Sequence, residues 1–135
     1  MDSNNPTILL LINDLIFETK IRSTARAIGL EVETARSAAA FGKAVPLRSY
    51  AGFIVDLDAG PDAIDAIQAT RSSPTCPELV AFGSHVQTEL LAAARQAGAD
   101  QVMPRSRFAA ELPAMLTMLM ESQRDRGPQQ GTPPL

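Results

Sequence analysis

Cysteine, histidine and aromatic residues are scarce in this chain of 135 residues. It holds one cysteine (Cys76) and one histidine (His85), no tryptophan, and 4% aromatic residues. A single cysteine excludes a disulfide within the chain, and one Cys with one His supply too few ligands for a zinc site of those residues. A Cys-His or Ser-His-Asp catalytic site would have to use the same histidine. The sequence therefore favours a protein that is not an enzyme, in the reducing cytoplasm.

An excess of positive charge and a long apolar run are also missing. Twelve Lys and Arg residues stand against fifteen Asp and Glu residues, and the formal net charge is -3. This balance provides no basic surface for nucleic acid. The early apolar run at residues 8–12 ends at Asn13, whereas a membrane span needs about 18–20 apolar residues. We expect neither nucleic acid nor a membrane as a partner, and the first residues lack the basic region of a signal peptide.

Hydrophobic residues make up 45% of the chain and charged residues 20%, a composition that can fill one globular core. Residues 6–122 are expected to form that domain. Residues 1–5 are expected to be a flexible N-terminus. Residues 123–135 are rich in Pro, Gly and Gln and contain little to bury, so they are expected to be a disordered tail.

Two kinds of apolar pattern alternate within residues 6–122. Short apolar or alternating runs predict strands at 7–12, 30–35, 52–57, 78–82 and 101–103. Apolar residues that recur every three or four positions predict helices at 17–28, 37–44, 61–70, 86–97 and 108–122. Gly29 and Gly98 follow two of these helices, as is typical of helix ends.

Five strands alternating with five helices predict an α/β protein with a doubly wound, flavodoxin-like parallel sheet, in the strand order 2-1-3-4-5. In such a sheet the functional site lies outside the carboxyl ends of the strands. Those ends fall at residues 12–14, 56–58, 83–85 and 104–106. We expect any chemistry to be located there.

The order and spacing of these elements resemble the receiver domain of two-component response regulators over about residues 7–122. Asp56 lies near the end of the third predicted strand, and the sequence AGAD at residues 97–100 precedes the fifth. The resemblance implies a role in two-component signal transduction or a phosphorelay, with Asp56 as the residue that accepts a phosphoryl group. It also implies Mg²⁺, held by an acidic pair after the first strand.

Most positions that would complete a receiver site carry other residues here. Ile12 and Asn13 stand where the acidic pair is expected. Gly83, followed by Ser84, stands where a hydroxyl residue is expected. Pro104, followed by Arg105, stands where the lysine is expected. Phosphoryl transfer depends on a metal and a lysine that neutralise the phosphoryl oxygens, and Mg²⁺ needs oxygen ligands. Isoleucine and proline side chains supply neither charge nor oxygen.

The sequence therefore predicts a pseudo-receiver that acts as a stand-alone interaction module, largely independent of Mg-dependent phosphorylation and without a metal or other cofactor. The alternative is an active single-domain response regulator that accepts a phosphoryl group on Asp56 and uses Mg²⁺. Asp56 could also simply cap the following loop, and Asp14 and Asp58 could join it in a displaced cation site. A nucleotide-binding protein or small enzyme is disfavoured because no glycine-rich phosphate loop follows the first strand.

The expected partners are signalling proteins, among them a histidine kinase or an output protein. A homodimer through the fourth helix, fifth strand and fifth helix is also expected, because methionines flank the core stripe of the last helix and adapt well at contact surfaces. The residues of this predicted interaction face are Gln87, Arg95, Arg107, Met118 and Met120.

Overall fold

The computed structural model describes residues 5–72 and 77–130, so Cys76 lies outside the described residues. Its centre is a five-stranded parallel sheet in the order β2-β1-β3-β4-β5, which confirms the predicted topology. The strands are β1 (Thr7–Leu11), β2 (Glu31–Ala35), β3 (Gly52–Asp56), β4 (Leu79–Gly83) and β5 (Gln101–Pro104).

The described chain contains six α-helices, where the sequence predicted five. They are α1 (Leu15–Ala27), α2 (Ala38–Ala44), α3 (Ala63–Arg71), α4 (Thr88–Ala97), α5 (Arg105–Ala110) and α6 (Leu112–Gln130), with short 3-10 helices η1 (Val45–Leu47) and η2 (Leu57–Ala59). The last predicted helix is divided at Glu111. Pro113 lacks the N–H that a continuous helix would donate to the carbonyl of Ala109, which favours a break at this point.

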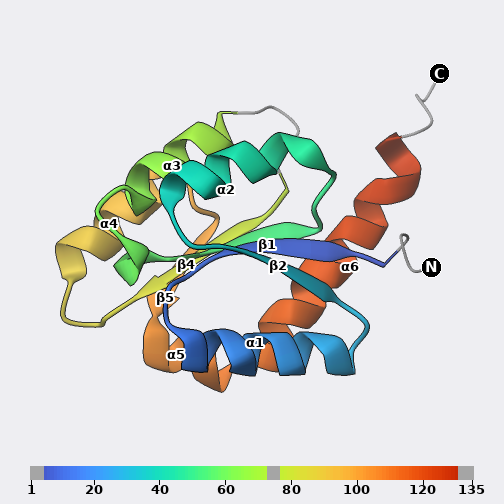
Figure 1. The fold of residues 1–135 in the computed structure, drawn as a ribbon, viewed down its shortest axis with the longest axis horizontal. Coiled ribbons are helices and arrows are strands. Elements are labelled where there is room, and N and C mark those ends of the chain that lie inside the picture. The colour runs from blue at the N-terminus through green and yellow to red at the C-terminus, as the bar shows by residue number, and fades with distance from the viewer. Residues whose placement is uncertain (1–4, 73–76, 131–135) are drawn as a thin grey trace.

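The helices form a layer on each face of the sheet: α1, α5 and α6 cover one face, and α2, α3 and α4 cover the other (Figure 1). Strand residues alternate between the two cores. In β1, Ile8 and Leu10 face the layer of α1, α5 and α6, while Leu9 and Leu11 face the opposite layer. All four are at most 1% exposed, as expected of a parallel strand covered on both sides.

The final helix packs closely against the sheet. A Cβ atom on Gly52 would lie 2.7 Å from Cδ2 of Leu119 and 3.3 Å from the carbonyl oxygen of Glu78, so a larger residue would force the buried Leu119 side chain to shift. The backbone of α6 stays helical to Gln130, whereas the sequence predicted a disordered tail from residue 123. Residues 1–4 and 131–135 lie outside the described residues.

In the part of the chain that the structure describes, no helix is both long enough and apolar enough to span a membrane.

Candidate functional site

Asp56 is the last residue of β3 and lies at the carboxyl edge of the sheet, as predicted. Its side chain is 2% exposed. The Oδ1 atom accepts a hydrogen bond of 2.9 Å from the backbone N–H of Asp58 and thereby caps η2. The capping interaction is thus present, and it accounts for one of the polar contacts of a buried carboxylate.

Arg105 supplies the positive charge next to this carboxylate. Its Nη2 atom donates to Oδ1 and Oδ2 of Asp56 at 3.1 and 3.3 Å, and to Oδ2 of Asp58 at 3.0 Å. Its Nη1 atom lies 3.8 Å from Oδ2 of Asp14. Since α5 begins at Arg105 and helical side chains tilt toward the N-terminus, the guanidinium extends back over the ends of the strands.

Aromatic rings hold the guanidinium from the sides. The Cζ atom of Arg105 lies 5.4 Å from the ring centre of Phe17 and 5.1 Å from that of Phe82, which are cation–π distances. Phe82 in turn stacks on Phe108 with ring centres 4.5 Å apart. Among the described residues, Nη1 of Arg105 is the buried side-chain nitrogen without a hydrogen-bond partner, and the aromatic contacts and Asp14 partly compensate for its loss of water.

The electrostatics of this pair reflect burial and charge together. Burial raises the pKa of Asp56 above its usual value and outweighs the lowering effects of the Asp58 N–H and of Arg105. Burial also disfavours the charged guanidinium, but the carboxylates of Asp56 and Asp58 raise the pKa of Arg105. Arg105 therefore stays charged at all physiological pH values and remains a fixed counter-ion for Asp56.

The side chains at the two positions where the acidic pair was expected lie in different environments, one in the core and one exposed to solvent. Ile12 is 0% exposed and belongs to the core beneath α1 and α6. Asn13 is exposed, and its Nδ2 atom donates to the carbonyl of Ala59 at 3.0 Å. Neither residue presents a carboxylate to Asp56.

The residues at the ends of β4 and β5, and Ser84 after β4, have mainly structural roles. A Cβ atom on Gly83 would lie 3.3 Å from Cβ of Leu57, so a larger residue would crowd the turn after β3. Ser84 accepts a hydrogen bond of 3.4 Å from the N–H of Val86. Pro104 ends β5 in an extended conformation and immediately precedes α5. It thereby places Arg105, rather than its own side chain, at the site.

Mg²⁺ does not fit the described residues. Asp14 caps α1 by accepting a 3.1 Å hydrogen bond from the N–H of Phe17, and the guanidinium of Arg105 stands between Asp14, Asp56 and Asp58. Among the described residues, no three His, Cys, Asp or Glu side chains are grouped so that they could hold a metal ion. The displaced cation site considered from the sequence is thus filled by a side chain of the protein itself.

The predicted interaction face is only partly exposed. Gln87, Arg95 and Arg107 are exposed, and Arg107 pairs with Glu111 at 3.2 Å. Met118 and Met120 are half-buried and pack against the core. The Sδ atom of Met118 also lies 3.8 Å from Nε2 of Gln101, so this methionine is in contact with the edge strand of its own sheet.

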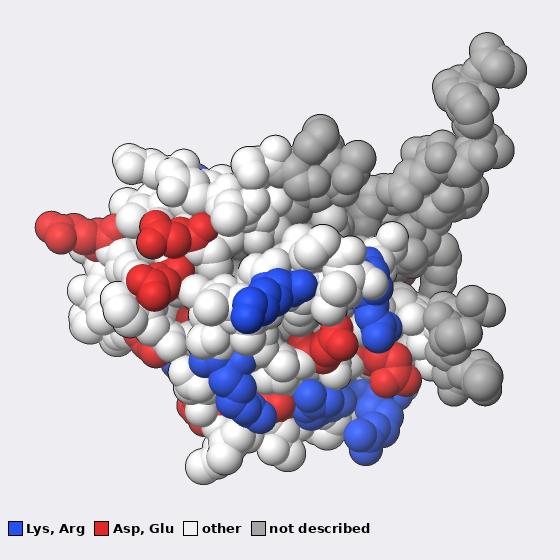
Figure 2. All heavy atoms as spheres, turned by 45° about the horizontal axis from the view of Figure 1, so that its top comes forward, with Lys and Arg blue, Asp and Glu red and all other residues white. Residues whose placement is uncertain are grey.

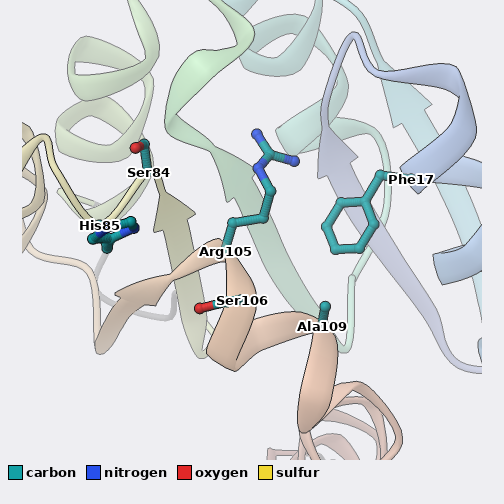
Figure 3. Close-up of a pocket in the computed structure, with 6 residues that line it drawn as sticks. All are labelled: Phe17, Ser84, His85, Arg105, Ser106 and Ala109. Carbon is teal, nitrogen blue, oxygen red and sulfur yellow. The ribbon is translucent and has the colours of Figure 1, made fainter.

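A pocket of about 370 Å³ opens beside Arg105. It is lined by residues from α1, α5 and the segment after β4: Phe17, Ser84, His85, Arg105, Ser106 and Ala109. Figure 3 shows the Arg105 side chain between Phe17 on one side and the segment of Ser84 and His85 on the other. Ser84, His85, Arg105 and Ser106 lie at the strand ends where the sequence predicted a site. The pocket itself was not predicted, because Phe17 and Ala109 in its wall come from helices far apart in the chain.

Neither a family model nor a curated protein sequence matches the chain. Solved structures do resemble it. A CheY-like response regulator receiver domain protein from Methanospirillum hungatei JF-1 superposes with a TM-score of 0.76 at 16% identity, over 92% of this chain and 100% of that one. The receiver domain of a sensor histidine kinase from Pseudomonas aeruginosa PAO1 has a TM-score of 0.75 at 18% identity, over 87% and 98% of the two chains.

The second of these structures has a magnesium ion in its active site cleft. NtrX from Brucella abortus, in complex with ADP, has a TM-score of 0.74 at 16% identity over 90% of this chain. The present chain spans only 28% of the NtrX chain. Together with the strand order, these likenesses show that the chain has the fold of response regulator receiver domains.

Proposed function

We propose that this protein is a pseudo-receiver: a protein-interaction module of signal transduction that works without Mg-dependent phosphorylation of Asp56. The observation that carries the proposal is the contact of the Arg105 guanidinium with both oxygens of Asp56 and with Asp58. Asp56 therefore already has an internal positive partner. An incoming phosphoryl group would have to displace that partner, without an acidic pair to hold a metal in its place.

The charge argument points in the same direction. A phosphoryl group brings about two negative charges to a site with three carboxylates and one guanidinium. Removal of one preorganised donor from an oxyanion hole typically slows an acyl transfer by about 10²–10³, and phosphoryl transfer depends on electrostatic contacts of the same kind. With the metal ligands and the lysine replaced, we expect acceptance of a phosphoryl group to be slower by several orders of magnitude.

Chemical phosphorylation tests this proposal. The protein is incubated with acetyl phosphate and Mg²⁺ and its intact mass is measured, with Asp56→Asn and Asp58→Asn as a matched pair of variants. We expect no phosphoryl adduct in any of the three. Stoichiometric labelling that survives in Asp58→Asn and disappears in Asp56→Asn would replace the proposal by the alternative, an active single-domain response regulator that uses Mg²⁺.

Contact with signalling proteins, such as a histidine kinase or an output protein, follows from the same proposal. Self-association through α4, β5 and the fifth predicted helix (residues 108–122, the end of α5 and the first part of α6) is part of it. Gln87, Arg95 and Arg107 would form a polar rim around the half-buried methionines of α6. Light scattering over a range of concentrations tests this point. A dimer mass that reverts to a monomer in Arg95→Glu is expected, and a monomer mass at every concentration would exclude self-association.

A further inference from the structure

The two edge strands of the sheet differ in how they are protected. Among the described strands, β2 and β5 are the two that have a neighbour on one side only. β5 has four residues and ends in Pro104, which has no N–H to donate. Short strands and prolines both discourage the addition of a further strand. β2 has five residues, EVETA, and no proline, so its outer edge depends on other protection.

The hydrogen bonds between β1 and β2 show which groups of β2 face outward. The N–H of Glu31 donates at 2.9 Å to the carbonyl of the residue before β1, and the carbonyl of Ala35 accepts at 3.2 Å from the N–H of the residue after β1. Both residues therefore turn their backbone groups toward β1. Because this direction alternates along a strand, Val32 and Thr34 turn their backbone groups away from the sheet. An added strand would bond to these two residues.

Arg22, on α1, covers this outer side of β2. Its Nη1 atom donates to the carbonyl of Val32 at 3.0 Å, and its Nη2 atom donates to the side-chain hydroxyl of Thr34 at 2.8 Å. The guanidinium therefore occupies an acceptor that an added strand would need, and it spans both residues that face outward. The Arg22 side chain is 41% exposed, so it lies between the strand and solvent.

Ion pairs hold the guanidinium in this position. Its Nε atom donates to Oε2 of Glu18 at 3.0 Å. Glu18 is buried, and it also accepts hydrogen bonds from Nη1 of Arg36 at 2.7 Å and from the Thr34 hydroxyl at 2.8 Å. Figure 2 shows acidic and basic side chains next to one another across the lower half of the molecule, the half that holds α1 in Figure 1. Each nitrogen of the Arg22 guanidinium thus has a partner within the chain.

We propose that Arg22 guards the outer edge of β2 against pairing with β2 of a second copy of this chain. A second copy fits the uncovered edge because the outward backbone groups are self-complementary. Two identical edge strands related by a two-fold axis pair in the antiparallel direction. With Glu33 at the axis, Val32 of each copy would exchange both of its backbone hydrogen bonds with Thr34 of the other.

Charge favours this pairing at the ends of the strands and opposes it at the centre. Antiparallel pairing places Glu31, at the start of each strand, near Arg36, which follows the end of the other strand. The two Glu33 carboxylates would meet at the axis, and like charges directly opposite each other destabilise a pair of strands. Arg48, 3.8 Å from Glu33, reduces this repulsion. Glu33 is therefore a second and weaker guard of the same edge.

Removal of the guanidinium tests the proposal on the full chain. Arg22→Ala uncovers the edge, and Arg26→Ala, at an exposed arginine one turn further along α1, is the matched control. Self-association is measured by sedimentation velocity over a range of concentrations, and the contacted strand by hydrogen exchange of the Val32 and Thr34 amides. Arg22→Lys is a second variant that keeps a charge beside Glu18, but its single nitrogen cannot replace the three contacts of the guanidinium.

We expect Arg22→Ala to self-associate about tenfold or more tightly than the wild type, and Arg26→Ala to match the wild type within about twofold. The amides of Val32 and Thr34 should become protected in Arg22→Ala as its concentration rises, whereas self-association through α4 and β5 would leave their exchange unchanged. Adding Glu33→Gln should tighten the Arg22→Ala dimer further. If Arg22→Ala does not fold, Arg22→Lys should show a smaller gain of the same kind.

Four results would overturn the proposal. The first is self-association equal to that of the wild type in folded Arg22→Ala, or in Arg22→Lys where Arg22→Ala does not fold. The second is an equal gain in Arg26→Ala. The third is a dimer of Arg22→Ala in which the amides of Val32 and Thr34 stay unprotected, and the fourth is a looser dimer when Glu33→Gln is added.

Discussion

Arg105 contacts both carboxylate oxygens of Asp56, with Nη2 at 3.1 and 3.3 Å, although the two residues are 49 positions apart in the chain. The contact joins the end of β3 to the start of α5. The same nitrogen lies 3.0 Å from Asp58, so one side chain contacts both carboxylates of the turn after β3. The Asp56 carboxylate is therefore already paired with a cation of the same chain, the guanidinium of Arg105.

Removing the guanidinium tests how strongly this contact holds the fold. Arg105→Gln leaves the 2% exposed Asp56 carboxylate without its counter-ion, and we expect a loss of about 2–4 kcal/mol in the free energy of unfolding. The full cost of breaking a buried pair is about 3–5 kcal/mol, and the value is reduced here because Arg105 is 31% exposed. Arg107→Gln, two residues away and 60% exposed, should cost less than about 0.5 kcal/mol.

A double-mutant cycle separates the pair from its surroundings. Asp56→Asn removes the buried negative charge, so Arg105→Gln should cost less in that background than in the wild type. We expect a coupling of about 1–3 kcal/mol, measured by urea unfolding. Additive effects of the two substitutions would mean that the contact contributes nothing to stability.

Glu18 is predicted to make stability depend on pH. Burial alone would raise the pKa of this carboxylate, but hydrogen bonds from Arg36, Thr34 and Arg22 lower it below its usual value of 4.5. A lowered folded pKa gives stability that is present above the unfolded value and is lost as pH falls through the folded value. Glu18→Gln should cost about 1–2 kcal/mol at neutral pH, with the difference shrinking in acid.

Urea unfolding at neutral pH and at about pH 3 checks this prediction, because the two values bracket the titration of carboxylates. Glu121→Gln, at an exposed glutamate on α6, is the control and should leave the pH profile unchanged. A Glu18→Gln deficit that stays constant down to low pH would show that packing, rather than charge, explains the role of Glu18.

The central strand should be sensitive to small cavities. Ile54 is 0% exposed in the middle of β3, and Ile54→Ala should cost about 2–5 kcal/mol through lost burial and the cavity left behind. Calorimetric melting measures the effect. A change below about 1 kcal/mol would mean that the neighbouring residues collapse into the space or that the strand is misplaced.

The end of the chain should contribute little to stability. Deletion of residues 124–135 is expected to change the free energy of unfolding by less than about 0.5 kcal/mol, the usual range for surface changes away from special features. A clear fall in melting temperature on truncation would show that this segment packs on the domain.

The strand order could be predicted from the sequence because few strand orders are compatible with the hydrophobic pattern. The residues of β1 and β3 are buried on both sides, and continuous apolar runs followed by helical periodicity leave few arrangements for a parallel sheet. The division of the last helix at Glu111 was missed, since the apolar period continues across the break. The helical backbone beyond residue 123 was missed because composition alone reports little about helix propagation.

The site was predicted less completely, for a geometric reason. The position of Asp56 follows from counting along β3, but the contact of Arg105 depends on where α5 starts. Sequence spacing placed Pro104 at the lysine position and Arg105 one residue beyond it. Because β5 ends at Pro104 and the helix begins at the next residue, the guanidinium reaches the three carboxylates. Such a one-residue change of direction is visible only in three dimensions.

The most direct test of a site closed by Arg105 is a crystal structure of the protein grown with Mg²⁺ and beryllofluoride, an analogue of the phosphoryl group. We expect Arg105 to remain paired with Asp56 and Asp58 and the Asp56 carboxylate to carry no adduct. Beryllofluoride bound to Asp56, with Mg²⁺ beside it and Arg105 displaced from the carboxylates, would mean that Arg105 does not block the site.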